Sequence, residues 1–403
     1  MSHIIADLPV EQMPSWAIWQ RHLFDSMDDV VEPYLQHFTR DNGEFIWDDA
    51  WGGGSPDDYF EPFFNWPLVY LMGGSERLLS LAERQFDAVT GQLMRLGSYH
   101  KDYGFREDQM HQSEADELFY HLCLAAPTSA RRLELAQRFA GFYLNQDKEA
   151  INYDAERRIV LSGLNGSKGA IVTDGADGRS YNPVGTTMEP YGLPFFDLPG
   201  IDSVKDLADP ANAKRMGTAM QQRWKAGDAP ANLAITSMMT NAFMLTQQEK
   251  YRDWVVEYTD AWLQRAQDNG GLLPDQIGPS GKVGEYVDGK WYGGRYGWTF
   301  PHGFLTMHFA TVDAGANAYL LTRDEKYLEL PRQQMDRILE LGEMRDHRQE
   351  HMSVGEEWKK QLDTVPEGEK TFLVPYRYGD AGWFDWMPMS ALYPVYLWHL
   401  SMR

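Results

Sequence analysis

A glycine-rich aromatic segment, residues 291–303, has the residue types that best suit binding of a sugar. It reads WYGGRYGWTFPHG. Glycines let the backbone approach a ligand closely, and the rings of Trp291 and Trp298 offer flat faces on which a sugar can stack. Arg295 between them could hold a carboxylate through two parallel hydrogen bonds. The alternative interpretation is a strained core loop whose aromatic side chains only pack.

A second segment, residues 376–385, repeats this combination of rings, a cation and acids in the sequence YRYGDAGWFD. We expect Arg377 to bind a substrate carboxylate together with Arg295. Asp380 and Trp383 are further candidates for contacts with the substrate. If the fold brings the two segments together, they form one pocket rather than two separate packing clusters.

Three carboxylates could carry hydrolytic chemistry. Glycoside hydrolysis usually needs two carboxyl groups, one to protonate the leaving oxygen and one to activate water or attack. Asp58 and Glu61 have the spacing of one helix face, and Glu114 precedes an apolar helix. We predict Glu61 and Glu114 as acid and base, with Asp58 as a third candidate. The structural alternatives are a capping box after Ser55 for Asp58 and a favourable helix-dipole charge for Glu114.

Tyrosine and histidine residues offer a different chemistry. β-Elimination beside a uronate needs a base and a neutralised carboxylate, so Tyr296, His302 and Arg295 could serve a lyase, with Tyr181 binding the substrate. Lys168 lies in a long segment with little helical periodicity and is a candidate carboxylate contact, although a solvated loop charge is the alternative. The chain has no H-E-x-x-H motif of the kind that binds zinc on a helix, so we expect no metal and no cofactor.

Helical periodicity recurs along the chain and must position these residues. It predicts helices over residues 16–38, 75–96, 112–125, 130–144, 231–245, 251–266, 304–321, 328–341 and 389–402. Strands are predicted only at 44–47, at 159–161 and within 283–292, where Asp288-Gly289 could turn a hairpin.

An internal repeat indicates how the helices are organised. Residues 241–251 and 317–327 share one pattern, in which a helix ends, a short polar turn follows and the next helix starts at a tyrosine. A weaker copy covers residues 68–78. Repeated helical hairpins build a solenoid or a closed toroid. Irregular spacing and long aromatic loops favour an all-α (α/α)6 toroid with a few short strands, spanning residues 1–403 as a single catalytic domain.

Three segments carry a resemblance to known proteins: residues 57–68 (DDYFEPFFNWPL), the 291–298 run and residues 376–385. Over most of its length the chain resembles the six-hairpin glycosidase superfamily, and within it a bacterial family associated with β-glucuronidase activity. Those relatives carry a His-Gly-Glu triplet where this chain has Gln112-Ser113-Glu114, so only the glutamate matches. The resemblance implies a toroid acting on uronic acids, although such toroids host hydrolases, lyases and isomerases.

Composition excludes several classes of protein. The net charge of −22 argues against nucleic acid and anionic membranes as partners, because both require a basic surface. The single cysteine, Cys123, excludes an internal disulfide framework and is expected in the core. No run approaches the ~20 apolar residues of a membrane span. The first residues lack the features of a signal peptide, so we expect a cytoplasmic protein.

These observations predict a glycoside hydrolase acting on a uronic-acid-containing oligosaccharide. The runner-up is a polysaccharide or oligosaccharide lyase that uses tyrosine or histidine with arginine. A sugar isomerase and a sugar-binding protein without catalysis also stay open. The expected partner is an acidic oligosaccharide, and assembly into a homo-oligomer stays open.

Overall fold

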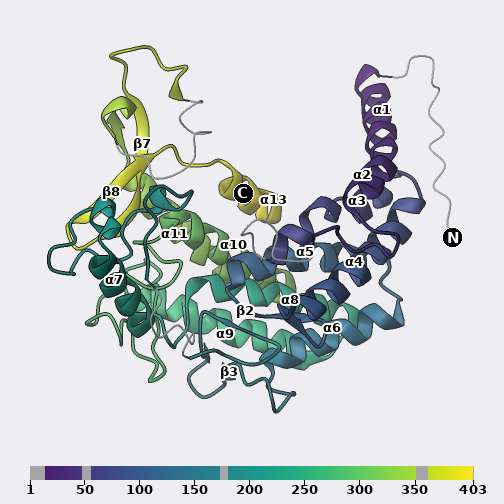
Figure 1. The fold of residues 1–403 in the computed structure, drawn as a ribbon, viewed down its shortest axis with the longest axis horizontal. Helices are drawn as coiled ribbons and strands as arrows, with labels where there is room; N and C mark the ends of the chain where they lie inside the picture. The colour runs from purple at the N-terminus through teal and green to yellow at the C-terminus, as the bar shows by residue number, and fades with distance from the viewer. Residues whose placement is uncertain (1–13, 48–55, 173–179, 351–361, 403) are drawn as a thin grey trace. The chain divides into compact units, whose positions relative to one another are not determined.

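The computed structural model describes residues 14–47, 56–172, 180–350 and 362–402. Within these ranges the chain is mainly helical with a few short strands (Figure 1). Its contacts group the chain into two compact units. Unit 1 comprises Met1–Gly97 and Ala115–Pro127, and unit 2 comprises Ser98–Glu114 and Thr128–Arg403. None of the described helices combines the length and the apolar character that a membrane span requires.

Unit 1 is built from helices. They are α1 (Ser15–Asp29), α2 (Val31–Phe38), α3 (Trp66–Leu71), α4 (Arg77–Leu96) and most of α5 (Gln109–Ala125). Helix α4 buries Leu78, Ala82, Phe86 and Val89 at helical spacing and ends at Gly97, whose φ of 87° closes the helix in the left-handed region. The sequence predicts this helix to within two residues at its start.

The helix predicted over residues 16–38 is wrong in one respect, because the structure ends α1 at Asp29 and starts α2 at Val31. Pro33 has no N–H group, so it cannot donate the hydrogen bond that an interior residue of one long helix makes. In the first turn of α2 the missing donor costs nothing, because N–H groups there have no partner within the helix.

The segment that carries Asp58 and Glu61 also differs from the prediction of one continuous helix. The structure has two short 3-10 turns, Pro56–Tyr59 and Glu61–Phe63, before α3 begins at Trp66. Pro62 lacks the donor that would continue a helix. The predicted alignment of Asp58 and Glu61 on one helix face is therefore wrong. The proposed cap, Ser55, lies outside the described residues.

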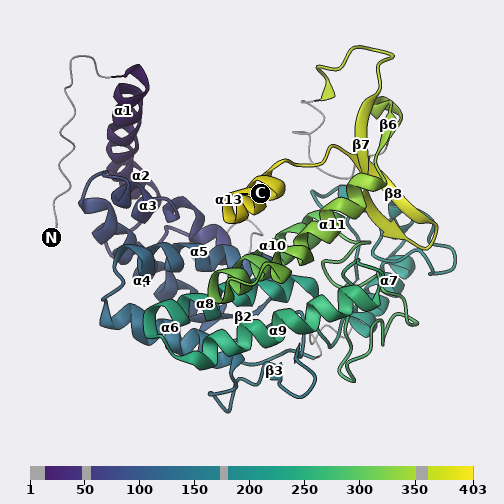
Figure 2. The ribbon, with the colours of Figure 1, turned by 180° about the vertical axis from the view of Figure 1, so that it is seen from behind.

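Helices also dominate unit 2, and most were predicted. They are α6 (Ala130–Tyr143), α7 (Pro210–Arg223), α8 (Ile235–Thr246), α9 (Glu249–Asp268), α10 (Gly303–Thr322), α11 (Glu329–Glu340) and α13 (Leu392–Ser401). Helix α10 packs against α8, α9 and α11 (Figure 2). Its buried positions surround the helix axis, as expected of a helix in the interior.

The helix end and the turn of the predicted repeat are confirmed, but the predicted helix start at the tyrosine is wrong. Helix α9 starts at Glu249, and Tyr327 lies in a 3-10 turn, Glu325–Leu328, before α11. Gln247 after α8 and Arg323 after α10 both adopt left-handed φ values, 55° and 63°, and both donate their N–H to a carbonyl four residues earlier at 2.7 Å. The tyrosines that follow, Tyr251 and Tyr327, are both buried, with exposures of 0% and 2%. The repeat therefore encodes the same helix end and turn twice.

Strands are short and mostly confined to unit 2 loops. Strands β1 (Tyr99–His100), β2 (Tyr103–Glu107) and β5 (Asn165–Gly166) form one antiparallel sheet, β3 (Tyr153–Asp154) and β4 (Ile159–Val160) form a hairpin, and β6 (Glu343–Arg345), β7 (Thr371–Gly379) and β8 (Gly382–Met387) form another sheet. The strand predicted at 159–161 is confirmed. Residues 44–47 make only one isolated bridge, and residues 283–292 form turns rather than a hairpin.

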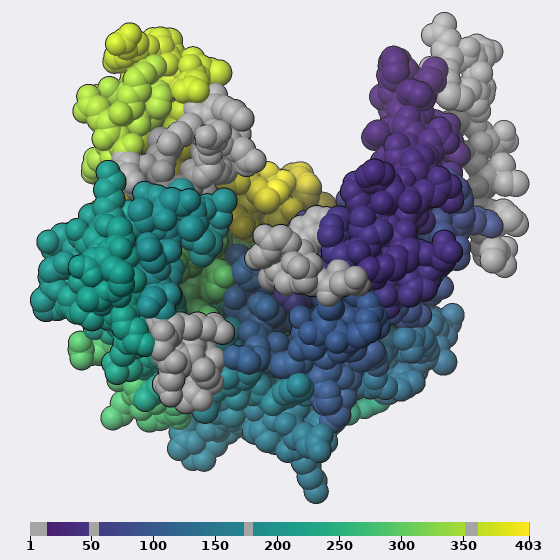
Figure 3. All heavy atoms as spheres, in the orientation of Figure 1, coloured from purple at the N-terminus to yellow at the C-terminus, as the bar shows by residue number. Residues whose placement is uncertain are grey.

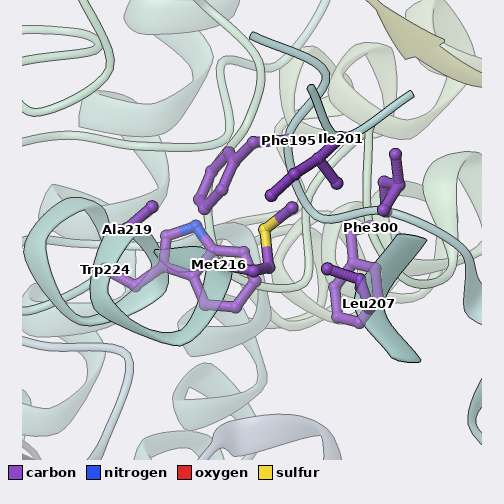
Figure 4. Packing of buried hydrophobic residues seen from close by; sticks show 8 residues of the cluster. Phe195, Ile201, Leu207, Met216, Ala219, Trp224 and Phe300 are labelled. Atoms are coloured by element: carbon purple, nitrogen blue, oxygen red, sulfur yellow. The ribbon is translucent and has the colours of Figure 1, made fainter. Parts of the chain in front are cut away.

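Strands β1, β2, β3, β5 and β6 of unit 2 were not predicted, and neither were two larger features. One is the β7–β8 hairpin, which the sequence presents as a loop. The other is α7, although Asp209 caps it by accepting the Ala211 N–H at 2.7 Å and Pro210 occupies its first position. Helix α7 and the chain before it form one continuous mass in the space-filling view (Figure 3). Met216 and Ala219 of α7 belong to an apolar cluster that also includes Phe195, Trp224 and Phe300 (Figure 4).

Candidate functional site

The aromatic segment 291–303 is held by a buried carboxylate that sequence reasoning missed. Asp275 accepts the backbone N–H groups of Gly294 at 2.8 Å, Gly293 at 3.1 Å and Trp298 at 2.7 Å. A Cβ on Gly294 or Gly297 would lie 2.0 Å from atoms of Asp275. The close approach that these glycines permit is therefore to Asp275. Burial raises the pKa of Asp275 to about 7, against the lowering effect of the backbone donors.

The two aromatic segments predicted to meet do meet. The N–H of Tyr378 donates to the Trp298 carbonyl at 3.0 Å, and the Trp291 and Tyr378 rings lie 4.7 Å apart. Trp298 is 0% exposed, donates its indole N–H to the Leu273 carbonyl, and touches Trp383 edge-on. Trp298 therefore supports the loop from within, while Trp291 and Trp383 are partly exposed.

A buried aspartate, a histidine and a tyrosine lie together in unit 2. Asp108 precedes α5 and its Oδ1 lies 3.0 Å from His111 Nδ1, while the Tyr296 hydroxyl lies 3.5 Å from the same nitrogen. Burial alone would raise the pKa of Asp108, but hydrogen bonding to His111 and the charges of His111 and Arg295 hold it below its usual range. Asp108 is thus a charged partner that fixes the orientation of His111.

Tyr296 stays protonated in this setting. Burial and the Asp108 charge raise the pKa of its hydroxyl well above the usual range. Its φ of 49° places it in the left-handed region, which is strained for an aromatic residue and turns its side chain toward His111. The Tyr296 hydroxyl is therefore a neutral proton donor that lies beside the imidazole of His111.

His302 lies beside this group, at the residue before α10. Its ring is 6.1 Å from the Tyr296 ring and 5.0 Å from the Tyr191 ring. Burial, followed by the charge of His111, lowers the pKa of His302 to about 4. His302 is therefore neutral at pH 7 and available as a base or hydrogen-bond partner.

The two arginines predicted to bind a carboxylate differ in their surroundings. Arg377 is 3% exposed, and its Nε donates to Asp385 at 2.6 Å while Nη1 donates to the Tyr191 carbonyl. Arg295 lies with its guanidinium 5.5 Å from the Trp224 ring centre, and its Nε has no hydrogen-bond partner among the described residues. Arg295 thus keeps donor capacity for an anion, while Arg377 is occupied within the protein.

The remaining predicted binding residues of unit 2 are spread over several contacts. The Tyr181 ring packs edge-on to Phe300, and its buried hydroxyl has no partner among the described residues. Lys168 is exposed and lies 3.9 Å above the Phe105 ring. Asp380, in the β7–β8 turn, accepts from Lys290 at 2.8 Å and Tyr292 at 2.9 Å.

The predicted hydrolytic carboxylates fall in different units, with Asp58 and Glu61 in unit 1 and Glu114 in unit 2. In unit 1, burial and the charges of Asp58, Asp57 and Glu117 raise the pKa of Glu61. Burial also raises the pKa of Glu117, which sequence reasoning missed. In unit 2, Glu114 lies in α5, which starts at Gln109, so Glu114 is in the second helical turn and not in the predicted first turn.

The sequence held a signal for Asp108, the missed partner of His111. Asp108 and His111 have the i, i+3 spacing that lets a residue at a helix start bond to the first turn. Asp275 follows Leu273-Pro274 and has no local motif, because its partners lie about 20 residues later in the chain. Glu107, Asp108 and His111 also have donor atoms within 4.8 Å of one another, as a metal site would.

Comparison with known proteins identifies a family without describing its chemistry. No curated protein and no solved structure matches the chain. One family model matches residues 3–403, nearly the whole chain. The chain therefore belongs to the family described as a domain of unknown function, DUF8034.

Proposed function

We propose that the protein is a carbohydrate-active enzyme that cleaves a uronic-acid-containing oligosaccharide by β-elimination in unit 2. The observation that carries this proposal is the Asp108–His111–Tyr296 group. The charge of Arg295 helps to lower the pKa of Asp108, and the Arg295 Nε has no hydrogen-bond partner among the described residues. A base, a proton donor and a cation are the three functions that elimination beside a carboxylate requires.

Each of these residues has its own role in the proposed elimination. Arg295 pairs with the uronate carboxylate and makes the adjacent C5 proton more acidic. The imidazole of His111, oriented by Asp108, removes that proton, and the electron pair forms the C4–C5 double bond as the C4–O bond breaks. Tyr296, whose raised pKa keeps it protonated, donates a proton to the leaving oxygen. His302 is the alternative base.

Glycoside hydrolysis is the second candidate, and one observation favours it. The raised pKa of Glu61 is the property of a general acid that must be protonated near neutral pH. In that case Glu61 protonates the leaving oxygen, and Asp58 of the same unit is the candidate for the carboxylate that activates water. We also propose that the helical hairpins belong to an (α/α)6 toroid of the six-hairpin glycosidase superfamily, supported by the repeated α8–α9 and α10–α11 turns.

The two chemistries differ in whether water enters the product. The experiment is incubation of the full chain with acidic and neutral oligosaccharides in ¹⁸O-labelled water. Elimination gives an unsaturated uronate that absorbs in the ultraviolet and carries no label, whereas hydrolysis gives a labelled, saturated product. An isomer of unchanged mass would select the isomerase, and saturable binding without product would select the sugar-binding protein.

Variants then assign the residues. Tyr296→Phe should lower the elimination rate by about 10²–10⁴-fold if Tyr296 is the proton donor. Tyr292→Phe is the matched control, since it removes a hydroxyl that bonds to Asp380 instead. Full activity of Tyr296→Phe, together with loss of activity in Glu61→Gln, would contradict the elimination proposal and support hydrolysis.

A further inference from the structure

A cleft in unit 2 gathers positive charge in a strongly acidic protein. It has a volume of about 660 Å³, and its walls include Arg157, Arg158, Arg265 and Lys326. Only two carboxylates, Glu156 and Asp260, line it, although the whole chain has 59 acidic and 37 basic residues. Among the described residues that line the cleft, cations therefore outnumber carboxylates, whereas in the whole chain carboxylates outnumber cations.

The walls of the cleft are fixed by hydrogen bonds. Helix α9 contributes Arg265, whose Nη2 donates to the carbonyls of Arg157 at 3.0 Å and Arg158 at 3.1 Å. These bonds tie the β3–β4 turn to α9, and Figure 2 shows the two elements side by side. Lys326, after α10, pairs with Asp260 of α9 at 2.9 Å. The cations therefore have a defined arrangement before any ligand arrives.

Each exposed cation of the cleft has a carboxylate partner, and Arg157 has a second one, Glu156, at 3.8 Å. Arg158 pairs with Glu257 at 3.2 Å and Arg157 with Asp154 at 2.8 Å, but these side chains are 51% and 42% exposed. Exposed ion pairs of this kind contribute little and exchange readily for another anion. Arg265 lies 5.2 Å from the Trp262 ring centre and pairs with no carboxylate of the described residues.

We propose that this cleft is a binding site for a multiply charged oxyanion, separate from the Asp108–His111–Tyr296 group. Such a ligand carries phosphate, sulfate or several carboxylate groups, each of which accepts parallel hydrogen bonds from guanidinium. Exposed Arg157, Arg158 and Lys326 supply donors, and Arg265 supplies a fixed charge. The proposal does not depend on the reaction that the enzyme catalyses.

Calorimetric titration of the full chain tests the proposal without any turnover. The probes are inorganic phosphate, sulfate and a digalacturonate, each titrated at constant ionic strength. Saturable binding of at least one probe is expected, and the tightest of the three identifies the ligand as a phosphate, a sulfate or an acidic sugar. Absence of saturable binding by all three would overturn the proposal.

Variants locate the binding. The double variant Arg157→Gln/Arg158→Gln should weaken the bound probe at least tenfold, and Lys326→Gln should weaken it less. Arg252→Gln is the matched control, because it also removes a cation of unit 2. Arg252 lies on α9, the helix that carries Arg265, but it pairs with Glu249 outside the cleft. Equal weakening in Arg252→Gln, or unchanged binding in the double variant, would show that only the overall charge matters and would contradict the site.

Discussion

Two arginines of unit 2 illustrate how surroundings decide the role of a residue type. Asp385 neutralises Arg377 within the protein, and removing either partner would leave a buried charge without compensation. Arg295 has its charge over the Trp224 ring and an Nε without a partner among the described residues. An incoming carboxylate therefore improves the bonding of Arg295 but would have to displace Asp385 from Arg377.

Arg295→Lys should reduce the preference for an acidic substrate over its neutral analogue by about tenfold, since a charge-assisted hydrogen bond contributes about 1.5–3 kcal/mol. The measurement is the ratio of kcat/KM for the two substrates. Arg323→Lys, at an exposed helix end, is the control and should keep the ratio of the original protein. An unchanged ratio in Arg295→Lys would remove this residue from carboxylate recognition.

His302 should make the folded state sensitive to acid. Its folded-state pKa, about 4, is below the ordinary histidine value of 6.5, so the unfolded chain binds the proton more readily. Its contribution to stability is complete above pH 6.5 and is lost as the pH falls toward 4. Urea unfolding at pH 7 and pH 4.5 should show a smaller loss for His302→Gln than for the original protein. His399→Gln, at an exposed position of α13, should lose as much as the original.

At the scale of elements, one buried carboxylate organises the aromatic loop. Asp275 accepts three backbone N–H groups of residues 293–298, so the loop conformation depends on a side chain rather than on a strand or helix. Asp275→Asn places an amino group against these donors, and we expect a loss of about 2–4 kcal/mol in the free energy of unfolding. Denaturant unfolding measures the loss, and a variant as stable as the original would show that the loop is held by its aromatic contacts alone.

The repeated turns allow a prediction of increased stability. Arg323 adopts a left-handed φ of 63° after α10, a conformation that glycine adopts without strain. Arg323→Gly should therefore raise the free energy of unfolding by about 0.5–1 kcal/mol. Leu320→Gly, at an exposed position inside the same helix, should instead lower it by about 1 kcal/mol. If both variants are destabilised equally, the turn geometry contributes nothing.

At the scale of the whole molecule, the number of cooperative units is testable. The sequence predicts one domain over residues 1–403, and the family model also spans nearly the whole chain. Calorimetry of a single domain should give one transition whose calorimetric and van't Hoff enthalpies agree. Two resolved transitions, or two proteolytic fragments that are each stable alone, would contradict the single-domain prediction.

The sequence by itself determined most of the helices and the turn that repeats between them. Helical periodicity, left-handed turn positions and caps are local properties, so α4, α6, α9 and α10 fall close to their predicted bounds. The local signals failed where proline interrupts a pattern, as at Pro33 and Pro62. They also failed for β7–β8, although these strands pair across a short turn, because Pro375 inside β7 interrupts the strand pattern.

Only the tertiary structure decided how the candidate site is composed. The sequence singled out Tyr296, His302 and Arg295, but their neighbours Asp108 and Asp275 lie 20 or more residues away along the chain. Burial and charge then set which groups are ionised: Asp108 stays charged, Tyr296 keeps its proton and His302 is neutral. These properties arise from long-range contacts and desolvation, which no local pattern of residue types contains.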